Sequence, residues 1–212
     1  PGALYTDGQI VLALTLLEAA TSPSAEWPPR DQLRVAVERA MSYVARDYWA
    51  HFASRLFYLD EQWHCAAAAA AIDHHRHDGY ERFCLDYATF RERLFIAADG
   101  RAHPDFVGGW GIGNLVPPHN TTTASHGEML AAVMQIKRRR GLDWAPEAAQ
   151  LRLVMRFLLR NQYHREGCFA CRRDVPFDGG FGEHMASPRI RIDYVQHAWS
   201  ALAGGARALG WR

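Results

Sequence analysis

Apolar and polar positions follow the period of an α-helix along almost the whole chain. In residues 29–47, Leu33, Val37, Ala40 and Val44 recur at intervals of three and four, which places them on one side of a helix. This pattern predicts seven helices, at residues 7–21, 29–47, 60–76, 79–97, 122–139, 145–162 and 193–208. Because no stretch shows the period of two that is typical of a half-buried strand, we expect an all-α fold.

The predicted helices are of two kinds, which alternate along the chain. The first, third, fifth and seventh are rich in Ala, Leu, Ser and Gly and carry little charge beyond their first turn, whereas the others carry Arg and Glu along one side. A helix that is apolar nearly all round is buried, and an amphipathic helix lies outside it. We therefore expect inner and outer helices to alternate in a series of α-hairpins. They would form a single repeat domain over residues 1–212, either complete or part of a longer polypeptide.

Two doubled-glycine segments precede inner helices. GGWG (108–111) and GGFG (179–182) align without gaps at an offset of 71 residues. The same offset places Pro188 on Pro117 and His197 on His126, while Asp193 falls on Thr122. Such matches in register indicate an internal repeat.

The repeat extends toward the N-terminus in weaker form. DEQWH, which contains Asp60 and His64, fits the same frame at the start of the third predicted helix. The first predicted helix begins with Asp7, and Val11 stands at the histidine position. The four inner helices thus begin at comparable points.

Alternating inner and outer helices with Gly-Gly-aromatic loops resemble the α/α-toroid folds. These include the six-hairpin glycosidases and sugar epimerases, and the protein prenyltransferases and terpenoid cyclases. Residues 179–205, GGFGEHMASPRIRIDYVQHAWSALAGG, look most like the second group. However, the sequence has neither the Asp-x-Asp-Asp motif that protonates a polyene nor an Asp-x-Cys zinc motif. A full toroid also has twelve helices, so the resemblance implies a complete or partial toroid.

Composition and charge narrow the class of protein only moderately. Of the 212 residues, 49% are hydrophobic and 22% are charged, as in ordinary globular proteins. The formal net charge of +1 provides no strong field for nucleic acid or anionic membranes. No apolar run is long enough to span a bilayer. Cytoplasm and periplasm both stay open, as does the oligomeric state.

The Asp-x-x-x-His pairs are the first candidates for catalysis. Residues four apart share a helix face, so Asp60 would lie beside His64 and Asp193 beside His197. A neighbouring carboxylate orients an imidazole and raises its pKa, which suits acid–base catalysis. An Asp in the first turn also complements the helix dipole, so the pairs equally fit a structural role.

A buried carboxylate and several loop residues complete the candidate site. Glu128 lies two residues after His126 within an apolar helix and needs a partner, for which Arg189 and Arg191 are candidates. The two arginines could equally hold a carboxylate of the substrate. Long irregular segments at 98–121 and 163–190 are of a length that is typical of binding loops. They supply side chains of the kind that stack on sugars or enclose an apolar ligand, including Trp110, His119, Phe169, Phe181 and His184.

Cysteine and histidine usage gives little support to a metal. Cys65 and Cys84 fall among apolar helical residues and are expected to be buried thiols. Cys168 and Cys171 form a lone C-x-x-C, which is half of a zinc site or a redox pair. His74, His75 and His77 end a predicted helix, where histidine complements the dipole. We expect no cofactor, with zinc as the alternative.

These features together favour an enzyme. The first hypothesis is a toroid-like domain that acts on a carbohydrate or a similar polar cyclic substrate, as a hydrolase, epimerase or lyase. Acid–base chemistry would fall to Glu128, Asp60 and Asp193, assisted by His64, His126 and His197. The partner would be a small molecule or an oligosaccharide. Two alternatives stay open: an isoprenoid-handling enzyme, and a binding or accessory domain without catalysis.

Overall fold

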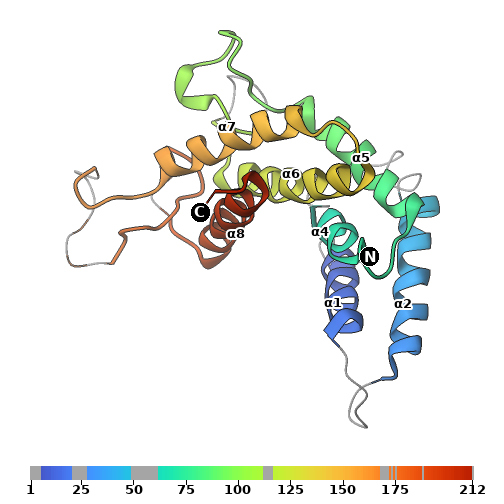
Figure 1. Cartoon of the computed structure of the whole chain (residues 1–212). Coiled ribbons are helices and arrows are strands. Elements are labelled where there is room, and N and C mark those ends of the chain that lie inside the picture. Colours follow the sequence, from blue (N-terminus) through green and yellow to red (C-terminus); the bar gives the residue numbers. More distant parts are fainter. Residues whose placement is uncertain are drawn as a thin grey trace. The chain divides into compact units, whose positions relative to one another are not determined.

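The computed structural model describes residues 6–20, 28–48, 62–111, 117–167, 172, 174, 176–187 and 189–211. Within these residues the chain forms seven α-helices (Figure 1), namely α1 (Thr6–Ala20), α2 (Arg30–Tyr43), α4 (Gln62–Ala71), α5 (Asp78–Glu92), α6 (Asn120–Arg140), α7 (Ala145–Asn161) and α8 (Ile192–Leu209). A π-helical turn (Val44–Tyr48) extends α2, and a 3-10 turn (Pro104–Phe106) lies between α5 and α6. The described part of the chain contains isolated bridges but no strand, which confirms the all-α class.

The helix boundaries agree with the predicted ones except at two C-terminal ends. Helix α4 ends at Ala71 instead of residue 76, because the amides of His74 and His75 both turn back to Ala71 O. Helix α5 ends at Glu92 instead of residue 97, because Phe95 leaves the helix to form an antiparallel bridge with Trp110. The predicted start of the third helix at residue 60 lies outside the described residues. No described helix is both long enough and apolar enough to span a membrane.

The chain divides into two compact units. Unit 1 comprises residues 1–91 and 132–144, and unit 2 comprises residues 92–131 and 145–212. In unit 1, α1 and α4 run in the same direction. Gly8 lies against Trp63 at their first turns, and Glu18 in the last turn of α1 bonds to His75 just beyond the end of α4. Figure 1 shows α2 beside α1. Arg34, near the start of α2, pairs with Glu18 at the end of α1, so α2 runs in the opposite direction.

A polar cluster joins the ends of these three helices. His75 bonds to Glu18 Oε2 through Nδ1 (2.9 Å) and to Glu38 Oε2 through Nε2 (3.0 Å). Burial opposes ionisation of Glu18, but hydrogen bonds and charges from His75 and Arg34 outweigh it and lower its pKa. The bond from His75 likewise lowers the pKa of Glu38. His75 therefore ties α1 and α2 to the turn after α4.

Unit 2 is built around a close approach of α6, α7 and α8. A Cβ atom at Gly127 of α6 would lie 2.9 Å from Val154 Cγ1 of α7 and 3.2 Å from Ala201 Cβ of α8. A Cβ at Gly205 of α8 would lie 2.9 Å from Met155 Sδ. The small residues that marked α6 and α8 as inner helices thus allow their backbones to approach α7 closely.

The two doubled-glycine loops, both in unit 2, have the same local structure. Gly108 N donates to Ile96 O (2.9 Å), and Gly179 N donates to Tyr163 O (2.8 Å). The next glycine of each loop donates to the carbonyl three residues earlier, in both cases over 2.9 Å. Gly108 and Gly179 have φ angles of 89° and 80°, which favour glycine. The two doubled glycines therefore share a positive φ at the first residue and the same pair of backbone hydrogen bonds.

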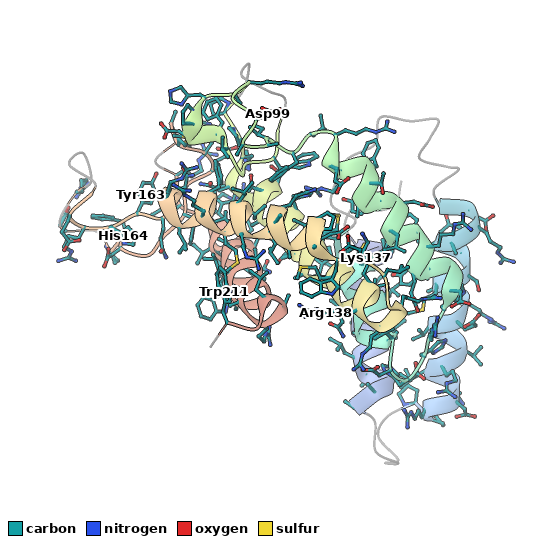
Figure 2. The ribbon with its side chains drawn as sticks, turned by 45° about the horizontal axis from the view of Figure 1, so that its top comes forward. Asp99, Lys137, Arg138, Tyr163, His164 and Trp211 are labelled. Carbon is teal, nitrogen blue, oxygen red and sulfur yellow. The ribbon has the colours of Figure 1, made fainter. Side chains whose placement is uncertain are left out.

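The second loop is held to the end of α7 by side chains. Tyr163, labelled in Figure 2 just beyond α7, donates its hydroxyl to Ser187 O over 2.9 Å. Gln162 Nε2 donates to Gly179 O over 3.0 Å. These bonds fix the course of the chain that leads into α8.

Two of the expected inner helices are less buried than the sequence predicted. Ile10 and Leu16 of α1 are about half exposed, and Ile192 and Trp199 of α8 are 88% and 70% exposed. The residues of α4, by contrast, are nearly all buried. The prediction of burial all round is therefore wrong for α1 and α8, whose packing partners cover one side only.

Candidate functional site

The most notable polar contact of unit 2 joins α6 to α8. His197 Nδ1 donates to Glu128 Oε2 over 3.0 Å, and the two side chains keep only 14% and 11% of their surface exposed. A carboxylate at Nδ1 fixes the tautomer and orientation of the imidazole, and it stabilises the ring when Nε2 takes up a proton. This arrangement is suited to general acid–base chemistry.

The partners differ from those that the sequence suggested. Asp193, expected beside His197, pairs instead with Arg191, whose Nε lies 3.0 Å from Asp193 Oδ1. The Arg191 guanidinium also lies over the Tyr194 ring at 5.0 Å. Arg189 is exposed. The partner of Glu128 is thus a histidine of another helix, α8, which residue spacing within one helix does not reveal.

His64 occupies a different environment in unit 1. Its ring is fully buried in α4, and Nδ1 is hydrogen-bonded to the Tyr80 hydroxyl of α5 at 2.7 Å. Burial lowers the pKa of His64 to about 4, whereas the sequence led us to expect a raised value. The ring is therefore neutral at physiological pH, and its contacts with Tyr80 and Phe83 are those of a core residue. Asp60 lies outside the described residues.

His126 is also fully buried, in a chain of polar contacts toward α7. Its Nε2 donates to Gln150 Oε1 (3.2 Å), and Gln150 Nε2 donates to Glu92 Oε1 (2.8 Å). The ring stacks on Phe95 with centroids 5.5 Å apart. These contacts position α6 against α7. Gln150 was not singled out from the sequence, since nothing in its surroundings marks it as a histidine partner.

The aromatic residues of the two glycine loops pack inside their loops. Trp110 is 4% exposed, and its amide donates to Thr123 Oγ1 over 3.0 Å. Phe181 is 2% exposed and pairs through its backbone with Gln162. Neither ring presents the open face that was expected to stack on a sugar.

A second Glu–His pair lies where the second loop meets the start of α6. His119 Nε2 donates to Glu183 Oε1 over 3.1 Å, and each side chain is one-third exposed. The hydrogen bond from His119, with the charges of His119, His184 and Arg189, lowers the pKa of Glu183. His184 uses Nδ1 to accept from Ala186 N. Glu183 was missed from the sequence, although its place directly after GGFG was a usable signal.

The metal hypothesis gains no support from the described residues. Among them, no group of three or more His, Cys, Asp or Glu side chains is arranged to hold a metal ion. Cys65 and Cys84 are buried, as expected, and burial with the neighbouring Cys65 thiol raises the pKa of Cys84. Cys168 and Cys171 fall outside the described part of the chain.

Comparison with known proteins adds no name to this description. The chain matches no protein family, no curated protein and no solved structure.

Proposed function

We propose that this chain is an enzyme domain of the α-hairpin repeat type, which acts on a carbohydrate or a similar polar cyclic substrate. Glu128 and His197 would exchange protons with the substrate. The observation that carries this proposal is the 3.0 Å bond between them, which joins two helices in a largely buried setting. Cleavage, epimerisation and elimination of sugars all require such a proton exchange.

The packing of the helices supports the repeat architecture of this proposal. Helices α1 and α4 lie in the same direction with α2 antiparallel to them, as inner and outer helices of adjacent hairpins would. The aligned glycines of the two loops also make hydrogen bonds of the same kind, although the acceptors Ile96 and Tyr163 are not aligned with each other. A partial or complete toroid is the simplest arrangement that would continue this pattern, and we propose it for the chain.

A product screen by NMR in D₂O tests the proposed function. The purified protein is incubated with glucose, galactose, mannose, N-acetylglucosamine, glucuronic acid, maltose and cellobiose, and in a separate sample with a prenyl diphosphate. Glycoside cleavage would release new anomeric signals, epimerisation would incorporate deuterium at a ring carbon, and elimination would produce a vinyl proton. We expect one of these signatures. Conversion of a prenyl diphosphate instead would favour the isoprenoid alternative, and binding without conversion would favour a binding domain.

The second Glu–His pair offers a matched comparison within the same unit. Glu128→Gln and Glu183→Gln each replace a carboxylate that accepts from a histidine. We expect Glu128→Gln to abolish conversion and Glu183→Gln to retain most of it. The opposite ranking would move the acid–base role from Glu128 to Glu183.

A further inference from the structure

Two hydroxyl groups of α6 lie on the face of the helix that carries Glu128. Thr121, Ser125 and Glu128 are spaced by four and three residues, which places them along one side of a helix. Ser125 is fully buried, and the oxygen of Thr121 is also shielded from solvent. The two hydroxyls therefore follow a line that leads to the Glu128–His197 pair.

Neither hydroxyl has a hydrogen-bond partner among the described residues. A buried hydroxyl without a partner costs free energy, so native proteins rarely keep one without a reason. Other threonines of the same turns do have partners. Thr122 Oγ1 donates to His119 O, and Thr123 Oγ1 accepts from Trp110 N. Thr121 and Ser125 thus carry the buried hydroxyls without a partner among the described residues of α6, and both face the side that leads to Glu128, while the amide oxygen Asn120 Oδ1 at the same end also has none.

We infer that Thr121 and Ser125 bind hydroxyl groups of the substrate and position it against Glu128 and His197. A hydroxyl both donates and accepts, so a pair of them matches a polyhydroxylated ligand better than an anion or an apolar chain. This inference rests on the proposed function and specifies its substrate class as a sugar or polyol bound through neutral hydroxyls.

The test compares Ser125→Ala and Thr121→Val with Thr122→Val as the matched control. Affinity is measured by isothermal titration calorimetry with the sugar of the panel that binds the wild type most tightly. Loss of one neutral hydrogen bond should weaken binding about two- to tenfold in each of the first two variants. The control, whose hydroxyl points to His119 O, should bind as the wild type does.

Thermal unfolding without sugar supplies a second readout. Removal of a hydroxyl that has no partner breaks no hydrogen bond. Ser125→Ala should therefore unfold at the same temperature as the wild type or at a higher one. A lower unfolding temperature would mean that the hydroxyl is already satisfied in the free protein, by water for instance, and would overturn the inference.

The outcomes separate this inference from the proposed function. Unchanged affinity in Ser125→Ala and Thr121→Val, with conversion still abolished in Glu128→Gln, overturns the inference alone. Weakened affinity in both hydroxyl variants, with full conversion by Glu128→Gln, overturns the acid–base role and supports the hydroxyl site. Failure of every sugar in the panel to bind the wild type overturns both.

Discussion

His64 and His197 each follow an Asp by four residues in the sequence, yet their surroundings differ. His64 is enclosed by aromatic residues, bonds to a tyrosine hydroxyl, and has a pKa lowered to about 4 by burial. His197 keeps some exposure and bonds to a carboxylate. Burial disfavours the imidazolium form of His64, whereas a carboxylate next to an imidazole favours that form. A shared Asp-x-x-x-His pattern therefore does not determine the role of the histidine.

The largest difference is expected in catalysis. His197→Asn should reduce the turnover of a converted sugar about 10²- to 10⁴-fold, because it removes the group that exchanges the proton. His64→Asn should leave turnover of the folded protein within about twofold, since a neutral core residue takes no part in the reaction. Steady-state rates of the two variants at equal folded concentration measure this difference. Equal losses in both would contradict the assignment of separate roles.

The glycine loops, alike in backbone, should differ in their tolerance of a side chain. A Cβ at Gly108 would lie 2.1 Å from Leu153 O, whereas a Cβ at Gly179 would come no nearer than 3.8 Å to Gln162 Nε2. Gly108→Ala combines steric overlap with a positive φ, so we expect a loss of about 2–5 kcal/mol in free energy of unfolding. In Gly179→Ala only the positive φ is unfavourable, so we expect a loss of about 1–2 kcal/mol in free energy of unfolding.

Urea denaturation monitored by circular dichroism measures both glycine variants. Equal losses would indicate that the chain around Gly108 moves away from α7, and would contradict the close approach of Gly108 to Leu153.

The stability of unit 1 should depend on pH through His64. Its pKa is lowered in the folded state, so the unfolded chain binds the additional proton as pH falls below the ordinary value of 6.5. The free energy of unfolding should keep the full contribution of neutral His64 above pH 6.5. It should decrease by about 3 kcal/mol as the pH falls to about 4. Below pH 4.5 the carboxyls of Glu18 and Glu38, whose pKa values are also lowered, add to the loss.

His64→Asn isolates this effect, because it removes the titrating ring and keeps an amide near the Tyr80 hydroxyl. The variant should lose the pH dependence between pH 6.5 and 4.5 in urea denaturation. A slope equal to that of the wild type would assign the titration to another group.

A further effect concerns the hydrogen-bond partner of His64. Tyr80→Phe leaves a buried ring nitrogen without its hydroxyl partner, and we expect a loss of about 1–3 kcal/mol in free energy of unfolding with no change in turnover. Thermal unfolding and a rate assay on the same sample measure both. A variant as stable as the wild type would show that the bond contributes nothing to unit 1.

The sequence predicted the helices well and the site only in part. Periodicity located all seven described helices, because each buries one side regardless of its partner. The aligned glycines were also a reliable signal, because a positive φ favours glycine whatever the rest of the fold. The pairing of Glu128 with His197 depends on how α6 approaches α8, which no local pattern encodes. For the same reason, the sequence suggested only a helix-dipole role for His75 and did not predict its bonds to Glu18 and Glu38.

The most direct test of the account is a comparison of wild type and Glu128→Gln with the sugar that the wild type converts. Glutamine keeps the shape of the side chain and a hydrogen-bond acceptor, but it can no longer carry the charge that stabilises a protonated His197. The account predicts that binding, measured as Kd, stays within about threefold while kcat falls at least about 100-fold. A kcat equal to that of the wild type would contradict the assignment of Glu128 and His197 as the acid–base pair.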